Sequence, residues 1–433
     1  MCRRLFLVFL LIIPCSAIFC QDTLHIRRKA CESIFLKENL QLIAERLNIP
    51  IARANLIQTK LWPNPTLTID QVNFWAKPYQ TGGNEAVPPM GNGFGRNQQF
   101  AFELEQIIQT AGKRRKLIAL SEISVHQAEL YFQELLRNMK FVFRTQLNEL
   151  YYIQRVEKSI SEHLQSFSQL VSLYEKQSIA GNIAQNYWHR LKTQEFSLQQ
   201  ELNFLKMQNQ ELQASLKALM NLPSEIELCL EADSTEYVES QYKNITWEKI
   251  FTTTKTQRPD YLLAQSELLY EEKKYQLEKS KRIPDLYLKG GYDRNGNAML
   301  DFVGFGITTD LPFFNRNQGN IRAASLAKEQ ADWQLKYKER VLESELMKSY
   351  RNFLLAQQTY QQTQSDFDHS LESMLDAYTR NFQRQHISML EYLDFTDAYL
   401  NYKKNYWNTV KTYHNSIEEL NYNVGIDIVN DSQ

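Results

Sequence analysis

The chain has 433 residues, and its 49 lysines and arginines nearly balance its 50 aspartates and glutamates, which leaves a formal net charge of −1 at pH 7. This balance excludes a general electrostatic attraction to nucleic acid, so we expect no nucleic-acid partner. Glycine and proline are scarce, at 14 and 11 residues, and this composition is typical of a protein built mainly from long helices.

The N-terminus is the first predicted element. Two arginines precede an apolar run over residues 5–13, and the segment "CSAIFCQD" offers a cleavage point after Cys20. This order is typical of a Sec-type signal peptide over residues 1–20, which is too short to span a membrane as a helix. The alternative is a lipoprotein signal with an acylated Cys20, although the bulky Phe19 stands where such signals carry a small residue.

The rest of the chain repeats itself. Residues 38–69 align with residues 257–288, and residues 173–185 align with residues 377–389. Each copy follows the order helix, strand, loop, strand, helix, turn, helix, and residues 223–245 join the two copies. Such self-similarity predicts one architecture built twice. The predicted domains are a first repeat over residues 21–222 and a second repeat over residues 246–433.

Each copy is predicted to contain a helical hairpin, with its tip near residue 181 in the first copy and near residue 385 in the second. No proline or glycine occurs over residues 113–180, which corresponds to roughly 100 Å of continuous helix. Spacings of three and four alternate along this helix, a heptad pattern that predicts coiled-coil packing. An earlier helix of the first copy contains Pro50, which predicts a kink or break there. The seam positions are Phe132, Leu136, Met139, Phe143, Gln146, Leu150, Ile153, Glu157, Ile160, Leu164, Phe167, Val171 and Tyr174.

Four predicted strands lie at about residues 64–75, 98–108, 284–293 and 300–311. They alternate apolar and polar residues over about ten positions, the length that a tilted strand needs to span a bilayer. A small soluble sheet with one buried face shows the same alternation, but the export signal favours the membrane. Four strands would leave open edges in lipid, and a water-filled pore needs more than eight strands. Several chains must then share one barrel, and three chains would supply twelve strands.

Short proline-containing segments mark the change from helix to strand. The segment "LWPNP" places Trp62, Pro63 and Pro65 before the first strand, and Pro284 and Pro312 flank the strands of the second copy. Proline ends a helix and biases the preceding residue toward extended geometry, and tryptophan is enriched at headgroup boundaries. We therefore predict that these five residues are the junctions between the helices and the barrel.

Residues that could carry chemistry do not gather into a catalytic or metal site. The seven histidines are scattered, and after Cys20 only Cys31 and Cys229 remain, either as a disulfide or, as we favour, as two free core residues. The glycine-rich run over residues 91–95 lacks the context of a phosphate loop. The basic run over residues 111–116 is interpreted as a solvated helix start near the membrane boundary. We expect no cofactor, no bound metal and no enzymatic activity.

One set of carboxylates stands out beside the second hairpin tip. Glu391, Asp394 and Asp397 recur every three residues, which keeps them on nearly one helix face. In a rotationally symmetric oligomer each would form a ring of like charge, and such rings select or bind cations at a constriction. The residues by themselves favour the alternative, a solvent-facing stripe on a surface helix.

Taken together, several segments resemble the TolC-like outer membrane efflux family, and most closely its heavy-metal (cobalt–zinc–cadmium type) branch. The resemblance extends over nearly the whole mature chain. The matching segments are "QTKLWPNPTL" (58–67), "EQIIQTAGKRRKLIAL" (105–120), "QRPDYLLAQ" (257–265), "RIPDLYL" (282–288), "LPFFNRNQGNIRAA" (311–324) and "ISMLEYLD" (387–394).

This resemblance implies a fold and a function. The expected fold is mainly α with a small β part, in which a homotrimer forms a twelve-stranded outer membrane barrel continued by a long periplasmic helical barrel. The expected function is a passive exit duct for metal ions or small toxic solutes. Its expected partners are outer membrane lipid, a periplasmic adaptor and an inner membrane transporter of the resistance-nodulation-division type. The alternatives are a periplasmic coiled-coil scaffold or adaptor, and the same duct used for type I protein secretion.

The resemblance also implies roles for single residues. The carboxylates that line the periplasmic constriction of the family fall on Glu391 and Asp394, whereas Asp397 has no counterpart. The hairpin tips are the expected adaptor contacts, and the second tip carries glutamine in place of the family's glycine. The residues expected at the tips are Gly181, Asn182, Arg384, Gln385 and His386.

Overall fold

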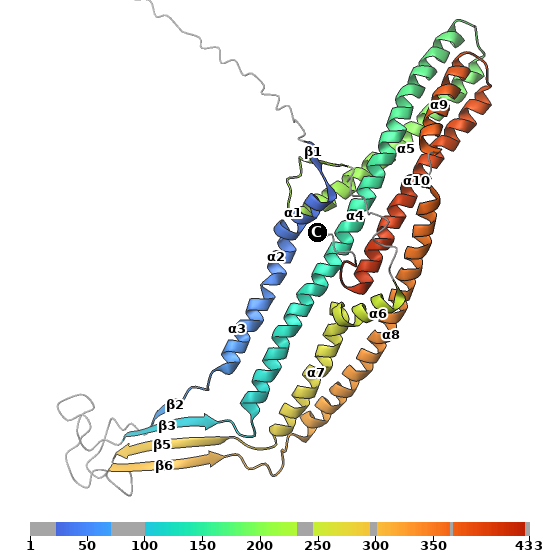
Figure 1. The fold of residues 1–433 in the computed structure, drawn as a ribbon. Helices are drawn as coiled ribbons and strands as arrows, with labels where there is room; N and C mark the ends of the chain where they lie inside the picture. Colours follow the sequence, from blue (N-terminus) through green and yellow to red (C-terminus); the bar gives the residue numbers. More distant parts are fainter. Residues whose placement is uncertain (1–22, 71–99, 232–245, 295–300, 364–366, 429–433) are drawn as a thin grey trace, which may run out of the picture. The chain divides into compact units, whose positions relative to one another are not determined.

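The computed structural model describes residues 23–70, 100–231, 246–294, 301–363 and 367–428 (Figure 1). The predicted signal peptide and most of the predicted join lie outside these ranges, as does the glycine-rich run. The described chain is mainly helical with a small β part, as predicted. It divides into two compact units, and helices α4, α8 and α10 contribute to both.

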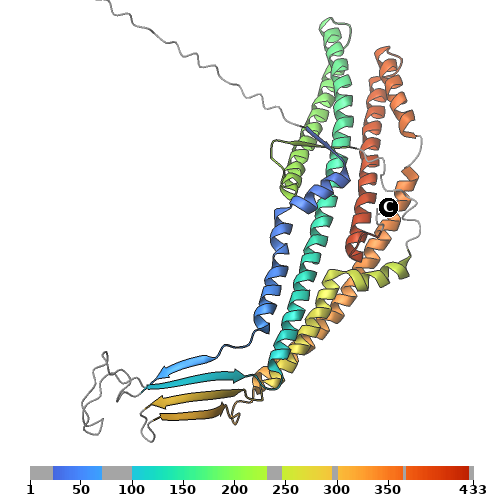
Figure 2. The same cartoon turned by 60° about the vertical axis from the view of Figure 1, so that its left-hand side comes forward.

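The unit that contains residues 41–140, 244–353 and 419–433 holds a four-stranded antiparallel sheet (Figure 2). Its strands run in the order β2 (Thr66–Asp70), β3 (Phe100–Ile108), β5 (Leu286–Arg294) and β6 (Asp301–Thr309). The two copies of the repeat meet at the β3–β5 pair, where Ile108 lies opposite Leu286. Strands β2 and β6 are therefore the two edges of the sheet.

The two faces of this sheet differ in chemistry. On one face, the register aligns Leu67 with Leu104, and Ile69 with Phe102. The same face continues through Val303, Phe305 and Ile307 of β6, and all seven of these side chains are large, apolar and exposed. The opposite face is charged: the Nζ of Lys289 lies 2.8 Å from the Oε1 of Glu103 and 3.0 Å from the Oε2 of Glu105.

The helices of this unit lead into and out of the sheet. They are α2 (Leu40–Arg46), α3 (Asn48–Lys60), the first part of α4 (Lys113–Ile179), α6 (Trp247–Gln257), α7 (Pro259–Ser280) and most of α8 (Gln318–Thr363). The interruption between α2 and α3 falls at Leu47, so Pro50 occupies the first turn of α3, where its missing N–H removes no helical hydrogen bond. Among the described residues, no helix combines the length and apolarity needed to cross a membrane.

A buried charge cluster holds the α6–α7 turn. Arg258 is 2% exposed, and its Nε donates a hydrogen bond to the Oδ1 of Asp260 at 2.8 Å. Lys338 contacts the same carboxylate at 2.8 Å, and Arg137 contacts it at 3.4 Å. Burial opposes ionisation of Asp260, but the hydrogen bonds and charges of these cations outweigh it and lower its pKa to about 2.

The other unit contains residues up to 40, 141–243 and 354–418. It holds α1 (Arg28–Glu38), the second part of α4, α5 (Gln185–Met220), α9 (Phe367–Gln383) and most of α10 (Met389–Val424). A two-stranded parallel sheet pairs β1 (Thr23–Ile26) with β4 (Glu227–Leu230). Cys31 and Cys229 are both free thiols, and burial raises the pKa of Cys31 to about 12.

The predicted seam of α4 forms the core of this unit. From Phe143 onward its apolar members are buried, apart from the half-buried Tyr174, and they pack against leucines of α5 and aromatic residues of α9 and α10. Tyr174 of α4 stacks on Phe382 of α9 with ring centroids 5.2 Å apart, and Phe382 stacks on Tyr392 of α10 at 4.6 Å. This aromatic stack joins the two helical hairpins near their tips, because each ring comes from a different helix.

Candidate functional site

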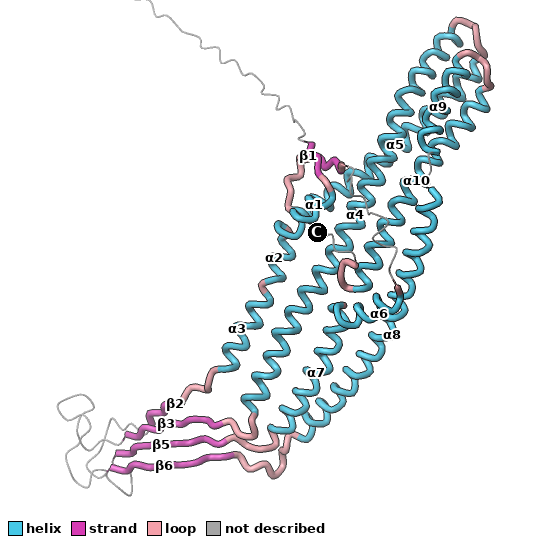
Figure 3. The backbone as a smooth tube through the Cα atoms, in the orientation of Figure 1, coloured by secondary structure: helices cyan, strands magenta, loops and turns pink. Residues whose placement is uncertain are grey.

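Two turns close the helical hairpins at the same end of the unit, between α4 and α5 and between α9 and α10 (Figure 3). The first turn is a Schellman motif, in which the N–H of Asn182 bonds to the carbonyl of Gln177 at 2.9 Å and the N–H of Gly181 bonds to the carbonyl of Ser178 at 3.1 Å. Gly181 has a φ of +77°, which glycine adopts without steric cost. Gly181 and Asn182 are both exposed, and nothing packs over the α-carbon of Gly181.

The second turn repeats this motif with different residues. The N–H of His386 bonds to the carbonyl of Asn381 at 2.8 Å, and the N–H of Gln385 bonds to the carbonyl of Phe382 at 3.0 Å. Gln385 has a φ of +60°, so a residue with a β-carbon occupies the left-handed position that Gly181 holds in the first turn. Arg384, Gln385 and His386 are all exposed.

Glu391 has a local structural role that the sequence interpretation missed. Its Oε2 accepts the backbone N–H of Ser388 at 2.7 Å, while the Oγ of Ser388 accepts the backbone N–H of Glu391 at 3.2 Å. This reciprocal pair is a capping box at the start of α10, and the sequence "SMLE" matches its signature. Hydrogen bonding to the Ser388 backbone, and then to its side chain, lowers the pKa of Glu391.

The three carboxylates differ in their surroundings. Glu391 and Asp394 are exposed one helical turn apart on α10. Asp397 accepts a hydrogen bond from the Nε2 of Gln194 on α5 at 2.9 Å, so it links the two hairpins. Burial raises the pKa of Asp397 and the charge of Asp394 raises it further, against the opposing effect of Lys404. Asp397 thus differs from Glu391 and Asp394 in its hydrogen bond to the other hairpin.

The predicted junction residues lie where helices meet the sheet. Trp62 is 61% exposed, and the guanidinium of Arg114 lies 4.4 Å from the centroid of its ring. The carbonyl of Pro63 accepts a hydrogen bond from the Nε2 of Gln106 at 3.0 Å. Pro65 is exposed immediately before β2. The contacts at the first junction thus include a cation–π contact and a bond to the neighbouring strand, and Arg114 also donates to the carbonyl of Lys60.

Pro284 and Pro312 flank the strands of the second copy. The carbonyl of Pro284 accepts the hydroxyl of Thr110 at 2.5 Å. The following Asp285 accepts the backbone N–H of Thr110 at 2.8 Å and pairs with Lys113 at 2.7 Å. Pro312 is half-buried and lies three residues after the end of β6. Sequence inspection missed the link through Asp285, although the acid follows directly after a junction proline.

Within the described ranges no group of three or more histidine, cysteine, aspartate or glutamate residues could hold a metal ion. The exposed pair on α10, the two tips and the two junctions are therefore the candidate functional features of one chain. A single exposed pair can bind a cation only weakly, whereas symmetry-related copies would multiply its charge.

The fold matches that of solved outer membrane channels. A CusC structure described in terms of folding and transmembrane channel formation aligns over 93% of this chain and 94% of its own, at 16% identity and a TM-score of 0.72. The outer membrane protein VceC of Vibrio cholerae aligns over 93% of this chain and 96% of its own, at 16% identity and a TM-score of 0.70. The CmeC outer membrane channel of Campylobacter jejuni aligns over 94% of this chain and 87% of its own, at 16% identity and a TM-score of 0.72.

At this level of identity the likeness establishes the fold. No protein-family model matches the sequence, and no curated protein matches it. The chain has the fold of TolC-like outer membrane channels.

Proposed function

We propose that this protein is a passive, gated outer membrane efflux channel that conducts metal ions or small toxic solutes to the exterior. The observation that carries the proposal is the exposed apolar face of the four-stranded sheet. Among the described residues, no layer covers the row of large apolar side chains on that face, as Val303 and Phe305 illustrate at 77% and 73% exposure. In water such a face would be covered, whereas lipid is its natural solvent, and the charged face around Lys289 then lines an aqueous interior.

The edges of the sheet imply an assembly of several chains. Strands β2 and β6 each leave one side of their backbone unpaired within a single chain. An open edge in lipid costs several kcal/mol for each unsatisfied backbone group. Pairing β6 of one copy with β2 of the next removes both edges, and three copies give a twelve-stranded barrel continued by periplasmic helices.

The proposed constriction and the proposed adaptor contacts both lie near the hairpin tips. In a rotationally symmetric assembly Glu391 and Asp394 form two carboxylate rings at the periplasmic constriction. The exposed turns around Gly181 and Gln385 are available to a periplasmic adaptor, and through it to an inner membrane transporter of the resistance-nodulation-division type. The proposal assigns no catalysis and no cofactor to the channel, and the heavy-metal branch is its proposed place within the family.

Adjacent residues of β2 provide a matched test, because Ile69 faces the apolar side of the sheet and Thr68 faces the polar side. We expect Ile69→Arg to destabilise the assembled protein by up to about 2–4 kcal/mol, depending on depth in the bilayer, and Thr68→Arg to be tolerated. The measurement is outer membrane fractionation followed by electrophoresis of heated and unheated samples. The unmodified chain should migrate as a heat-sensitive trimer.

A soluble scaffold predicts a different outcome. Both arginine variants would then accumulate equally in the periplasmic fraction, because both positions would face water. Recovery of the unmodified chain as a soluble monomer would reject the channel and favour the scaffold.

A further inference from the structure

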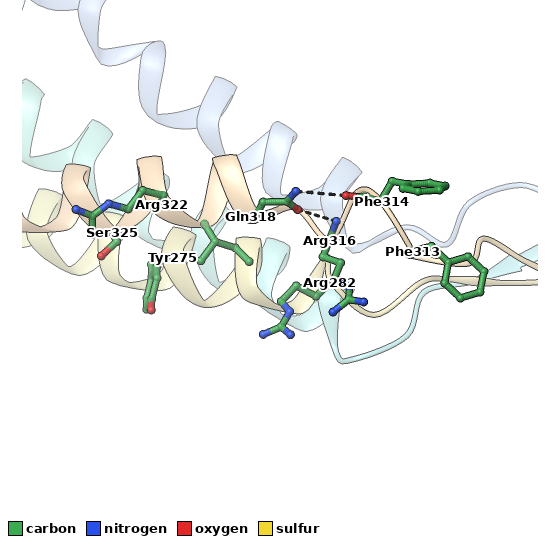
Figure 4. Close-up of a pocket in the computed structure, with 9 residues that line it drawn as sticks. Tyr275, Arg282, Phe313, Phe314, Arg316, Gln318, Arg322 and Ser325 are labelled. Atoms are coloured by element: carbon green, nitrogen blue, oxygen red, sulfur yellow. Dashed lines mark hydrogen bonds between the residues drawn. The ribbon is translucent and has the colours of Figure 1, made fainter.

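A solvent-open hollow of about 600 Å³ lies where α7 ends, β6 ends and α8 begins (Figure 4). The chain segment between β6 and α8 is held in a defined turn. In this turn Gln318 accepts the backbone N–H of Arg316 at 2.8 Å and donates to the carbonyl of Phe314 at 3.3 Å. The principal lining residues are Tyr275, Arg282, Phe313, Phe314, Arg316 and Arg322.

The hollow carries positive charge that the chain does not neutralise. Arg282, Arg316 and Arg322 are all exposed, and in the part of the chain that the structure describes none of them forms an ion pair. The neighbouring carboxylate of Glu278 is engaged elsewhere, by Lys281 at 2.6 Å and by the Nδ2 of Asn317 at 2.7 Å. Uncompensated guanidinium groups that line one hollow favour an anion there, with Arg322 at the end away from the strands (Figure 4). Guanidinium binds phosphate oxygens with two parallel hydrogen bonds.

Apolar surface continues from this charge toward the strands. Phe314 is 95% exposed and Phe313 is 68% exposed, and both lie on the strand side of the arginines (Figure 4). Leu311, which precedes them, is 67% exposed. A small soluble anion would gain nothing from these side chains. A molecule with an anionic head and an apolar tail would use both parts of the surface.

The first junction shows the same pairing of chemistry at the same end of the sheet. Ile108 at the end of β3 lies opposite Leu286 at the start of β5. The basic run over residues 111–116 follows β3, and Arg282 precedes β5, so both lie at this end of the sheet. In that run Arg114 covers the exposed ring of Trp62. Basic and aromatic residues therefore gather twice at the helix end of the sheet, as they do at membrane headgroup boundaries.

We propose that the hollow binds the phosphate of an anionic phospholipid, with the two phenylalanine rings against its acyl chains. The proposal rests on the proposed function, because only a sheet that lies in the outer membrane would bring this junction to the lipid headgroups of the periplasmic leaflet. The bound lipid would fix the depth of the β6–α8 junction in the membrane. Each arginine near the surface should strengthen retention of an anionic lipid by about fivefold.

The test compares two double variants of the full-length protein in detergent. Arg282→Gln with Arg322→Gln removes charge from the hollow and leaves Arg316, whose Nε donates to the carbonyl of Pro312 at 3.2 Å. Arg340→Gln with Arg351→Gln removes equal charge from exposed sites farther along α8. Native mass spectrometry during titration with phosphatidylglycerol should show about twentyfold weaker retention in the first variant and little change in the second.

Two further arms identify the ligand. Phosphatidylcholine should be retained more weakly than phosphatidylglycerol by the unmodified protein, and Phe314→Ser should weaken lipid retention. Competition by millimolar inorganic phosphate would assign the hollow to a soluble anion and overturn the lipid proposal. Equal retention of phosphatidylglycerol by both double variants would also overturn it. If only the Arg282 and Arg322 double variant failed to form a trimer, the surface would be a contact between copies, and the lipid proposal would be wrong.

Failure of the proposed function gives a different result. A protein that inserts into neither phosphatidylglycerol nor phosphatidylcholine vesicles would not be a membrane channel. If the protein inserts into both kinds of vesicle and the two double variants retain phosphatidylglycerol equally, the protein would remain a channel without this lipid site.

Discussion

The two helical hairpins have the same backbone turn but stabilise it with different residues. In the first, Gly181 takes the left-handed position without strain, and α5 begins after Ala184 with no side-chain cap. In the second, Gln385 takes the same position at a steric cost, while Ser388 and Glu391 cap the start of α10. Both hairpins thus share the turn geometry. The first is favoured by an unstrained glycine in the turn, and the second by a side-chain cap on the helix that follows the turn.

The candidate constriction residues, Glu391 and Asp394, belong to the second hairpin, whose tip carries Gln385 in place of glycine. The alignment of the repeats sets Tyr187 and Arg190 of α5 against Glu391 and Asp394 of α10. At these two aligned positions only the second hairpin carries carboxylates. Because Glu391 is also a capping residue, its charge and its helix-capping role must be separated by experiment.

The largest expected effect is on ion passage. Glu391→Gln with Asp394→Asn should raise single-channel conductance in planar bilayers and weaken divalent block by about tenfold or more, a change equivalent to about 1.4 kcal/mol of cation binding. Glutamine can still accept the Ser388 N–H, so the capping box remains. Glu175→Gln, at an exposed carboxylate of the first hairpin, is the control and should leave both properties unchanged. Unchanged block in the double variant would reject the constriction assignment.

Exchanging the residues at the two left-handed positions should change the stability of the two tips in opposite directions. Gln385→Gly should stabilise the second tip, and Gly181→Gln should destabilise the first, each by about 1 kcal/mol, because a β-carbon is disfavoured at positive φ. Local amide hydrogen exchange at each tip measures both changes. Two changes of the same sign would show that contacts of the side chains, and not backbone strain, distinguish the tips.

Exchange of the helix caps should produce an effect of about 1 kcal/mol or less. Ser388→Ala removes the hydroxyl that accepts the Glu391 N–H and should loosen the first turn of α10 by about 1 kcal/mol. Ala184→Ser adds a cap to α5 and should protect its first turn by a similar or smaller amount. The amide protection of the first turn reports each change. An Ala184→Ser variant without added protection would indicate that α5 begins with a geometry that cannot accept a cap.

The smallest effect is the pH dependence of the second tip. The pKa of Glu391 is lowered in the folded state, so its contribution is present above the unfolded pKa and is lost as pH falls through the folded value. Protection of the first turn of α10 should therefore decline below about pH 4, relative to the first turn of α5. In Glu391→Gln this decline should disappear. A parallel decline at both tips would point to general acid loosening of the hairpins.

Sequence patterns anticipated the parts of this fold that depend on local periodicity. The heptad spacing and the lack of proline and glycine over residues 113–180 indicated the helix that extends from Lys113 to Ile179. The alternation of strand residues indicated a sheet with one apolar and one polar face, and Pro50 marked the interruption that precedes α3. Each of these features is set by residues within a few positions of one another, so a single sequence contains the information.

Long-range contacts were not predictable in the same way. Asp285 joins Thr110 and Lys113, and Asp397 joins Gln194, across separations in sequence that no periodic pattern encodes. The capping box at Ser388 has a local signature in "SMLE", but the three-residue spacing of the carboxylates does not indicate it. The arginine hollow combines α7 with the turn before α8, and neither segment alone indicates an anion site.

The long helices, the alternating strands and the turn between each pair of helices are predictable from residue order alone, because these features follow from local propensity and spacing. The pairing of β3 with β5, the ion pair of Asp285 with Lys113 and the bond between Gln194 and Asp397 appear only in the folded chain. Those outcomes depend on which segments meet in space. A side chain acquires its pKa, its strain and its partners only when that packing is complete.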